Sequence, residues 1–346
     1  MEPNKTQNSS MQRFLKNIRE GHLLSRQDAT EAISSLLDGN ASTAQAGAFL
    51  MGLSQRGETV DEIVAAANIL RARATTITAP PHSVDCCGTG GDHSHSYNIS
   101  TAVAFVVAAC GVPVAKHGNR AASSQSGAAD VLESLGVNLN LSPAQCETAL
   151  HQFGFCFLMA PAFHASLKPL AALRKELGFR TIFNLIGPLA NPAGTSYQLL
   201  GVFDKSWVRP MAEALKELGT VSALVVHGAD GLDEITLTGD TYCARLQNGQ
   251  ISEFTLTPSD FGLPTISSES IKGGDATTNA RALMELLQGK PSSYRDIVVA
   301  NAGATLELCG KSSDLKQGVA LAQKAIDTGA ALKILENYIS FSNTHT

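Results

Sequence analysis

The sequence predicts an α/β protein with a small all-helical domain and a larger domain that has a central, mainly parallel sheet flanked by helices. Apolar residues recur at helical spacing from Met11 to Arg73. After a Pro-containing break at 78–83, short apolar runs alternate with helical segments, which is typical of crossover units in a parallel sheet. A length of 346 residues favours about two domains. We therefore expect a helical domain over 1–80, joined by helices from about 167–185, and an α/β domain over 81–346.

Capping residues divide the N-terminal part into separate helices. Ser25, Ser42 and Thr59 each stand directly before a helical run, where a hydroxyl can accept a hydrogen bond from a first-turn amide. Gly39 and Gly57 follow the first two of these runs, and glycine commonly ends a helix. This part of the chain reads as a plain helical bundle.

The second part carries the strand signals. Each short apolar run is followed by a loop and then a helical pattern, except near the C-terminal third, where period-two alternation surrounds Asn248-Gly249 and predicts a β-hairpin. Helices return from about residue 276 to the C-terminal end. The predicted strands lie at 84–87, 112–117, 155–160, 197–203 and 221–228, with the hairpin within 233–258.

Composition excludes several classes of function. The net charge of −5 argues against a general nucleic-acid or membrane-surface binder. The start of the chain lacks the apolar run of a signal peptide, and no apolar stretch is long enough to span a membrane. The seven cysteines form no CxxC pair, which favours a reducing compartment without disulfides. We expect a cytoplasmic protein that binds neither nucleic acid nor membrane.

The segment Gly88-Thr89-Gly90-Gly91-Asp92 follows the first predicted strand of the sheet and suggests a phosphate loop. Glycines let the backbone turn and approach a ligand, and a helix that begins near Ser100 adds a favourable dipole for an anion. The alternative is a metal site of Cys86, Cys87, His93 and His95. Adjacent strand residues point to opposite faces and the spacing is not that of a zinc site, so the sequence favours phosphate.

A second loop, "KHGNRAASSQSG" at 116–127, also follows a strand and precedes a helix. Lys116, His117 and Arg120 suit anionic oxygens, and Asn119 with the serines at 123, 124 and 126 can form hydrogen bonds. Alone it would read as a solvated basic loop. Two such loops on neighbouring strand ends suggest a polyphosphate held between them.

Adjacent acids, Asp233 and Glu234, follow the strand predicted at 221–228. A lone acidic pair is usually ordinary surface. Its position after a core strand places it on the same rim as the two loops, where a pair of carboxylates can hold Mg²⁺ together with water and substrate phosphates.

These motifs together resemble the anthranilate phosphoribosyltransferase family. The resemblance extends over nearly the whole chain and is carried by "GETVDEI", "GTGGD", "NIST", "KHGNRAASSQSGAAD", "RKELGFRTIFNLIGPLANP", "GLDE" and "GGDATTNA". It implies transfer of the phosphoribosyl group of 5-phosphoribosyl 1-pyrophosphate (PRPP) to the amine of anthranilate, with Mg²⁺ and release of pyrophosphate, in tryptophan biosynthesis. It also implies a homodimer joined through the helical domain.

The resemblance also implies roles for individual residues. Gly88, Asn119 and Arg174 would meet anthranilate, with Arg174 on its carboxylate, and Ser100, Asp233 and Glu234 would hold Mg²⁺. No general base is identified. PRPP would be bound by Gly88, Gly91, Asp92, Ser96, Asn98, Ile99, Ser100, Thr101, Lys116, His117, Gly118, Asn119, Arg120, Ala121, Ala122, Ser123, Ser124 and Ala128.

The chain departs from the family pattern at several positions. His93-Ser94-His95 stands where the family often has small residues, Ala128 where it often has serine, and Ala165 where it often has proline. Two other functions stay open. A pyrimidine nucleoside phosphorylase resembles this fold but needs no paired metal carboxylates, and a non-catalytic relative that binds nucleic acid would have a basic groove and eroded metal ligands.

Overall fold

The computed structural model describes residues 5–92, 94–121 and 125–344 and divides the chain into two compact units. The first unit consists of Met1–Thr75 and Pro161–Pro192, and the second of Thr76–Ala160 and Ala193–Thr346. The first is helical and the second contains the sheet, so the predicted fold class is confirmed. None of the helices in the described ranges has both the length and the apolarity that crossing a membrane requires.

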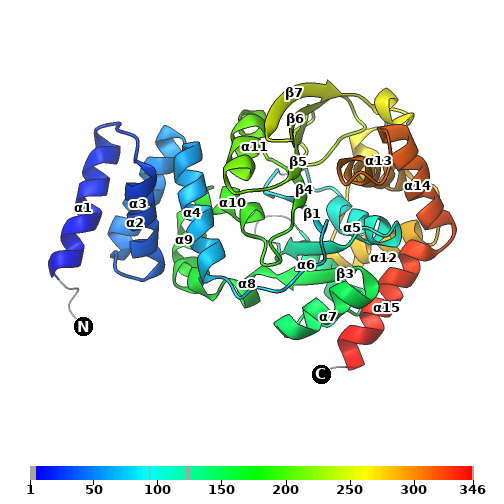
Figure 1. Cartoon of the computed structure of the whole chain (residues 1–346), viewed down its shortest axis with the longest axis horizontal. Helices are drawn as coiled ribbons and strands as arrows, with labels where there is room; N and C mark the ends of the chain where they lie inside the picture. Colours follow the sequence, from blue (N-terminus) through cyan, green and yellow to red (C-terminus); the bar gives the residue numbers. More distant parts are fainter. Residues whose placement is uncertain (1–4, 93, 122–124, 345–346) are drawn as a thin grey trace. The chain divides into compact units, whose positions relative to one another are not determined.

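The helical unit is built from two stretches of chain (Figure 1). The hydroxyls of Ser25, Ser42 and Thr59 accept hydrogen bonds from first-turn amides, which confirms the three predicted caps. The helices of the first stretch are α1 (Lys5–Arg19), α2 (Arg26–Leu37), α3 (Thr43–Arg56) and α4 (Val60–Arg73). The second stretch holds α8 (Ala160–Phe163), η1 (Ala165–Leu170), α9 (Ala171–Leu177), α10 (Ile182–Ile186) and η2 (Pro188–Ala190).

A buried carboxylate joins three segments of the helical unit. Glu62 is 1% exposed and forms a salt bridge with Arg56, through two hydrogen bonds from one guanidinium nitrogen. The same carboxylate accepts from the amides of Thr59 and Leu24, at 2.9 and 3.3 Å. Glu62 therefore ties the start of α4 to the end of α3 and to the segment before α2.

Replacement of Glu62 by alanine is expected to lower the free energy of unfolding by about 3 kcal/mol or more, because it leaves a part-buried guanidinium and two amides without their acceptor. Urea denaturation followed by circular dichroism measures this. The control is Glu31→Ala, which removes an exposed partner of Arg13 and should cost less than about 1 kcal/mol. Equal losses in the two variants would contradict the assigned role of Glu62.

The second unit contains a seven-stranded sheet in the order β3-β2-β1-β4-β5-β6-β7. The five strands from β3 to β5 are parallel, and β6 and β7 are antiparallel additions. The mainly parallel sheet is therefore confirmed. Its strands are β1 (Val84–Gly88), β2 (Val114–Gly118), β3 (Phe155–Met159), β4 (Tyr197–Gly201), β5 (Ser222–Gly228), β6 (Thr241–Gln247) and β7 (Gln250–Leu256).

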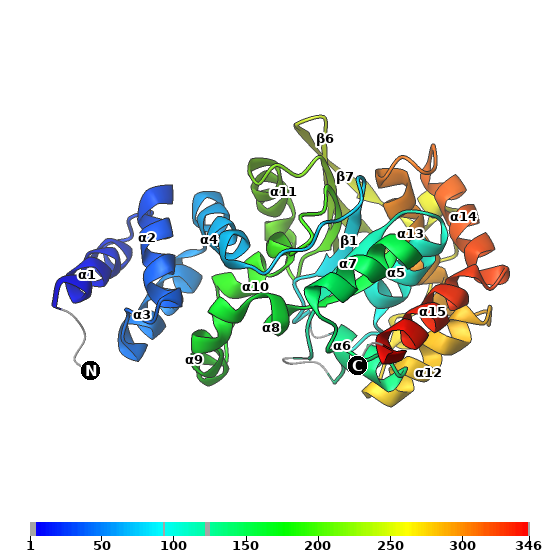
Figure 2. The same ribbon diagram turned by 60° about the horizontal axis from the view of Figure 1, so that its bottom comes forward.

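Helices cover both faces of this sheet (Figures 1 and 2). The connection from β1 to β2 runs toward one edge of the sheet, and the connection from β4 to β5 runs toward the other edge. Because both crossovers are right-handed, α5 and α11 lie on opposite faces. Helix α5 packs on β1 and β2 and against α13, while α11 packs on β5 and β6. The helices are α5 (Ile99–Ala109), α6 (Ala128–Ser134), α7 (Pro143–Phe153), α11 (Val208–Glu217), α12 (Ala276–Leu287), α13 (Ser293–Leu308), α14 (Leu315–Asp327) and α15 (Ala330–Thr344).

The hairpin at Asn248-Gly249 is confirmed, with φ of 52° and 72° at the two residues. The period-two pattern was misleading before it, because β6 begins only at Thr241. Residues 229–240 form a loop instead. Asp230 holds this loop by accepting hydrogen bonds from the hydroxyls of Thr236 and Thr238, at 2.8 and 2.7 Å.

Candidate active site

The predicted loops meet at the carboxyl edge of the parallel strands. The strand order reverses between β1 and β4, and such a switch point is where open α/β sheets bind ligands. Gly88 ends β1 and faces Gly201, which ends β4, as register partners across this point. Asp233 and Glu234 belong to the loop after β5, the next strand along.

The two paired glycines make room for the loop that carries the acids. A Cβ atom at Gly201 would lie 1.5 Å from the backbone oxygen of Asp233, and one at Gly88 would lie 2.3 Å from the Asp233 carboxylate. No side chain fits at either position without moving Asp233. In this structure the close neighbour of Gly88 is Asp233, whereas the approach to a ligand phosphate stays a prediction.

The acidic pair is held by backbone amides of the first loop and of α5. The Asp233 carboxylate accepts from the amide of Gly90 at 2.8 Å, and Glu234 accepts from the amide of Ser100 at 3.1 Å. Burial raises the pKa of both carboxyls, that of Glu234 to about 7; for Asp233 the negative charges of Asp92 and Glu234 add to the effect. A cation at this position would offset the repulsion between the acids.

Lys116 lies beside this pair, buried at 2% exposure on β2. Its ammonium donates to the backbone oxygen of Cys86 at 2.7 Å and to the hydroxyl of Ser100 at 3.1 Å. Its charge also lowers the pKa of Glu234 against the effect of burial. Lys116 is thus a fixed positive charge under the start of α5.

The start of α5 holds four of the predicted residues. Asn98 is the N-cap residue, and Ile99, Ser100 and Thr101 form the first turn. The Thr101 hydroxyl is buried and has no hydrogen-bond partner among the residues that the structure describes. An unpaired buried hydroxyl at a helix N-terminus suits an anionic oxygen. Ser96 precedes this turn and pairs with Lys272 in an isolated bridge.

The second loop begins at Gly118, the last residue of β2, and leads into α6 at Ala128. The Asn119 side chain accepts from the amide of Arg120 at 2.8 Å, and the amide of Ala121 donates to Asp130 at 2.9 Å. Ala122, Ser123 and Ser124, all predicted to bind PRPP, lie outside the described residues.

Arg120 differs from the simple expectation of a cation awaiting phosphate. Its guanidinium pairs with Glu133 and Asp130 on α6, and the hydrogen bonds to Glu133 raise its pKa. A phosphate oxygen would have to compete with these two carboxylates. His117, by contrast, is buried, and its amide donates to Asp85 at 3.3 Å.

The donor set of Asp233, Glu234 and Ser100 fits Mg²⁺ only in part. Within the described ranges, no group of three or more His, Cys, Asp or Glu side chains is arranged to hold a metal ion. Two carboxylates with raised pKa values suit a Mg²⁺ ion that takes its remaining ligands from water and from the phosphates of a substrate.

The cysteines before the first loop serve packing. The Cys86 thiol lies 3.7 Å from the Thr305 hydroxyl of α13, and Cys87 accepts from the Gln198 side chain of β4 at 3.3 Å. Burial raises the pKa of both thiols, that of Cys86 to about 12, which disfavours the thiolate that zinc requires.

Arg174 lies in α9, in the helical unit. Its guanidinium stands over the Phe183 ring of the same unit, 5.5 Å from the centroid, and burial lowers its pKa. A half-buried arginine that stacks on an aromatic ring keeps its donors in a fixed plane, which is the arrangement that a carboxylate recognises.

Sequence reasoning missed two residues that position the site. Gly201 carries no motif, and its role appears only through its pairing with Gly88. Asn301 of α13 is fully buried and holds the residue after Glu234 from both sides, because it accepts from the Ile235 amide at 3.0 Å and donates to the Ile235 carbonyl at 2.9 Å. A polar residue at a core position of a long helix was the only available signal for Asn301.

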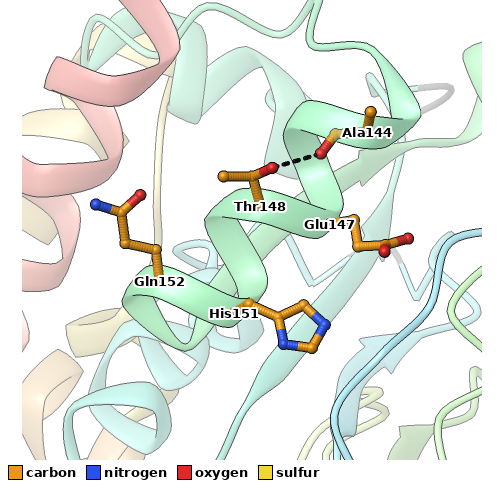
Figure 3. A pocket seen from close by; sticks show the side chains of 5 residues that line it. All are labelled: Ala144, Glu147, Thr148, His151 and Gln152. Atoms are coloured by element: carbon orange, nitrogen blue, oxygen red, sulfur yellow. Dashed lines mark hydrogen bonds between the residues drawn. The ribbon is translucent and has the colours of Figure 1, made fainter.

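A separate cavity of about 570 Å³ opens on α7. Figure 3 shows its lining, which comes from this one helix: Ala144, Glu147, Thr148, His151 and Gln152. None of these residues belongs to the strand-end loops, so the cavity is not part of the candidate active site.

Comparisons with known proteins identify the family. The family model described as glycosyl transferase family, a/b domain, matches residues 80–332, and the helical bundle domain of the same family matches residues 12–74. A relative from Rhodopseudomonas palustris (strain BisA53), named anthranilate phosphoribosyltransferase, is 53% identical over 94% of this chain and 96% of its own.

Solved structures agree with these relatives. The anthranilate phosphoribosyltransferase of Thermus thermophilus superposes with a TM-score of 0.90 at 42% identity, over 95% of this chain and 99% of its own. The Saccharomyces cerevisiae enzyme in complex with PRPP and Mg has a TM-score of 0.90 at 28% identity, over 97% of this chain and 98% of its own. The same yeast protein has also been solved with 4-fluoroanthranilate.

Proposed function

The chain belongs to the anthranilate phosphoribosyltransferase family of pentosyl-transferring enzymes, and we propose that it transfers the phosphoribosyl group of PRPP to the amine of anthranilate in tryptophan biosynthesis. The observation that carries this proposal is the meeting of the first loop, the start of α5 and the acidic pair at the switch point of the sheet. One edge of the sheet thereby brings together the N-terminus of α5, which suits a phosphate, and two carboxylates, which suit a cation.

The reaction breaks the bond between C1 of the ribose and the pyrophosphate oxygen, and forms a bond from C1 to the anthranilate nitrogen. Positive charge develops on the ribose and negative charge on the leaving pyrophosphate. Amides of the first loop and of α5, together with the Lys116 ammonium, would stabilise that negative charge. The aniline nitrogen is already nucleophilic, so positioning contributes more than a strong base.

For the binding of PRPP we propose the residues of the two loops and the first turn of α5. Gly88, Gly91, Asp92 and Ser96 would line the pyrophosphate and ribose, and the segment from Asn98 to Thr101 would hold phosphate. Lys116 to Ala121, with Ala122, Ser123 and Ser124 and with Ala128, would close around the phosphoribosyl group. Anthranilate would be met by Gly88, Asn119 and Arg174, with its carboxylate on Arg174.

Asp233, Glu234 and Ser100 would hold Mg²⁺, which is present in the yeast complex. The ion, when bound, supplies positive charge to the leaving pyrophosphate. We expect addition of EDTA to abolish turnover and an excess of Mg²⁺ to restore it, because the two carboxylates otherwise repel the phosphates. Turnover that persists in EDTA would show that the acidic pair has another role.

We also propose that the protein is a cytoplasmic homodimer joined through the helical unit. Leu23 and Met51 of that unit are exposed by 65% and 47%, and a partner bound at the helical unit would cover apolar surface of this kind. Light scattering on the full chain should give twice the mass of one chain, and Met51→Glu should shift the mass toward that of the monomer.

The experiment that tests the reaction follows anthranilate fluorescence in the presence of PRPP and Mg²⁺, with each component omitted in turn. We expect fluorescence to fall only when all three are present with the protein. A well-folded protein that leaves the fluorescence unchanged would contradict the proposal and favour the phosphorylase reading.

A further inference from the structure

The N-cap of α5 does not cap its own helix. Asn98 makes no side-chain hydrogen bond to α5. By contrast, the side chains of Ser25, Ser42, Thr59 and Ser142 all accept from amides of the helices that they precede. Asparagine is among the best capping residues, but the Asn98 backbone has φ of −76° and ψ of 75°, whereas the four capping residues are extended, with ψ of 159° or 160°.

Two segments far away in the sequence hold the Asn98 side chain. Its Nδ2 donates to the backbone oxygen of Ser126 at 3.2 Å, and its Oδ1 accepts from Nδ2 of Asn279 at 2.9 Å. The Tyr294 hydroxyl donates to the Asn98 carbonyl at 3.0 Å. The oxygen that would cap α5 is therefore engaged by Asn279.

Asn279 is itself fixed in one orientation. It is 2% exposed at the start of α12, and its Oδ1 accepts from the amide of Gly274 at 2.7 Å, so its Nδ2 faces Asn98. The preceding residue, Gly273, allows this approach, because a Cβ there would lie 2.7 Å from Asn279 Oδ1 and 2.8 Å from the Ser96 oxygen. Gly273, Gly274 and Asn279 belong to the "GGDATTNA" motif, and this contact gives them a structural role that the reaction alone does not explain.

The engagement of Asn98 leaves part of the α5 N-terminus open. The Ser100 amide donates to Glu234, so the Thr101 amide is the one that a capping Asn98 would take. The Thr101 hydroxyl, buried at 1% exposure, has no hydrogen-bond partner in the described part of the chain. Both groups are donors that an anionic oxygen can use.

We propose that Asn279 is a positioning residue that keeps the Asn98 side chain off the N-terminus of α5, so that this terminus stays open for a phosphate oxygen of PRPP. The inference rests on the proposed function. If Asn279 is removed, Asn98 can turn to the extended backbone of the other caps and cap α5, and substrate must then displace an internal ligand. The loss of binding should fall on KM for PRPP and leave KM for anthranilate largely unchanged.

The test compares Asn279→Ala with Asn138→Ala. Asn138 is the control, because it is a part-buried asparagine of the same unit whose Nδ2 donates outside the loops, to the backbone oxygen of Ser342. For Asn279→Ala we expect KM for PRPP to rise about fivefold, the ratio that matches a typical capping hydrogen bond. KM for anthranilate and the thermal midpoint should stay close to those of the control.

Two results would overturn the inference. One is an unchanged KM for PRPP in active Asn279→Ala protein. The other is a lower kcat and a lower midpoint with both KM values unchanged, which is what a purely structural role gives.

A double-mutant cycle tests the route through Asn98. Once Asn98→Ala has removed the capping side chain, adding Asn279→Ala should leave KM for PRPP unchanged. If the rise in KM for PRPP in the double variant equals the product of the rises in the two single variants, Asn279 does not act through Asn98.

The thermal midpoint separates this inference from the proposed reaction. Wild type could fail to consume anthranilate while PRPP with Mg²⁺ still raises its thermal midpoint. The proposed reaction would then be contradicted, and the role of Asn279 would be tested by whether Asn279→Ala loses that rise. If wild type shows no rise, the phosphate site itself is contradicted and the inference falls with it.

Discussion

The double variant Asp233→Asn/Glu234→Gln is expected to lose at least about a hundredfold in kcat/KM without losing thermal stability. Both replacements keep an oxygen that accepts from the amides of Gly90 and Ser100, so the loop should keep its place. They remove two carboxyl groups whose charged forms are disfavoured in the free protein by burial and by the negative charge of Asp92. Activity and stability should therefore respond in different directions, as expected for residues selected for function.

Progress curves over a series of Mg²⁺ concentrations, with a thermal melt of the same preparations, measure this result. Asp240→Asn is the control, because Asp240 is an exposed acid at the end of the same loop. A double variant that keeps wild-type activity and Mg²⁺ dependence would remove the acidic pair from the account. A variant that melts well below wild type would show that the pair stabilises the fold.

The second large effect is expected at a residue with no chemistry of its own. Gly201→Ala should lower the free energy of unfolding by about 3 kcal/mol or more, because its Cβ would overlap the Asp233 backbone, which cannot rotate away as a side chain can. In the protein that remains folded, kcat/KM should fall by about a hundredfold, since a shift of about 1 Å in a ligand group is enough for such a loss.

The matched control is Gly239→Ala in the loop that carries Asp233. No atom lies within 4 Å of a Cβ built at Gly239, and this residue is not among those with positive φ. Chemical denaturation and initial rates for the two variants should differ clearly. If Gly201→Ala proves as stable and as active as Gly239→Ala, the packing of Asp233 on the switch point is not what places the acids.

Much of the fold follows from local signals that the structure confirms. The three hydroxyl caps of the helical unit and the Asn248-Gly249 hairpin depend on residues close in sequence, and such signals survive folding. The segment at 233–240 misled because its alternating pattern imitates a strand. There the backbone is held by Asp230 and Asn301 instead of by a neighbouring strand.

The site divides in a similar way. The types and positions of the glycines, acids and basic residues in the strand-end loops indicate phosphate and metal binding. The residues that hold these groups are Gly201, Asn279 and Asn301. They lie up to 181 positions away in the sequence, and only the topology brings them to the loops. Arg120 shows the converse, because its type suggests phosphate while α6 supplies it with two acids.

The measurement that tests the central claim most directly counts anthranilate consumed and pyrophosphate released in one reaction with PRPP, Mg²⁺ and the purified chain. We expect equal amounts of the two, with no release of pyrophosphate when anthranilate is left out. Pyrophosphate released without anthranilate, or turnover that instead requires a nucleoside and inorganic phosphate, would contradict it.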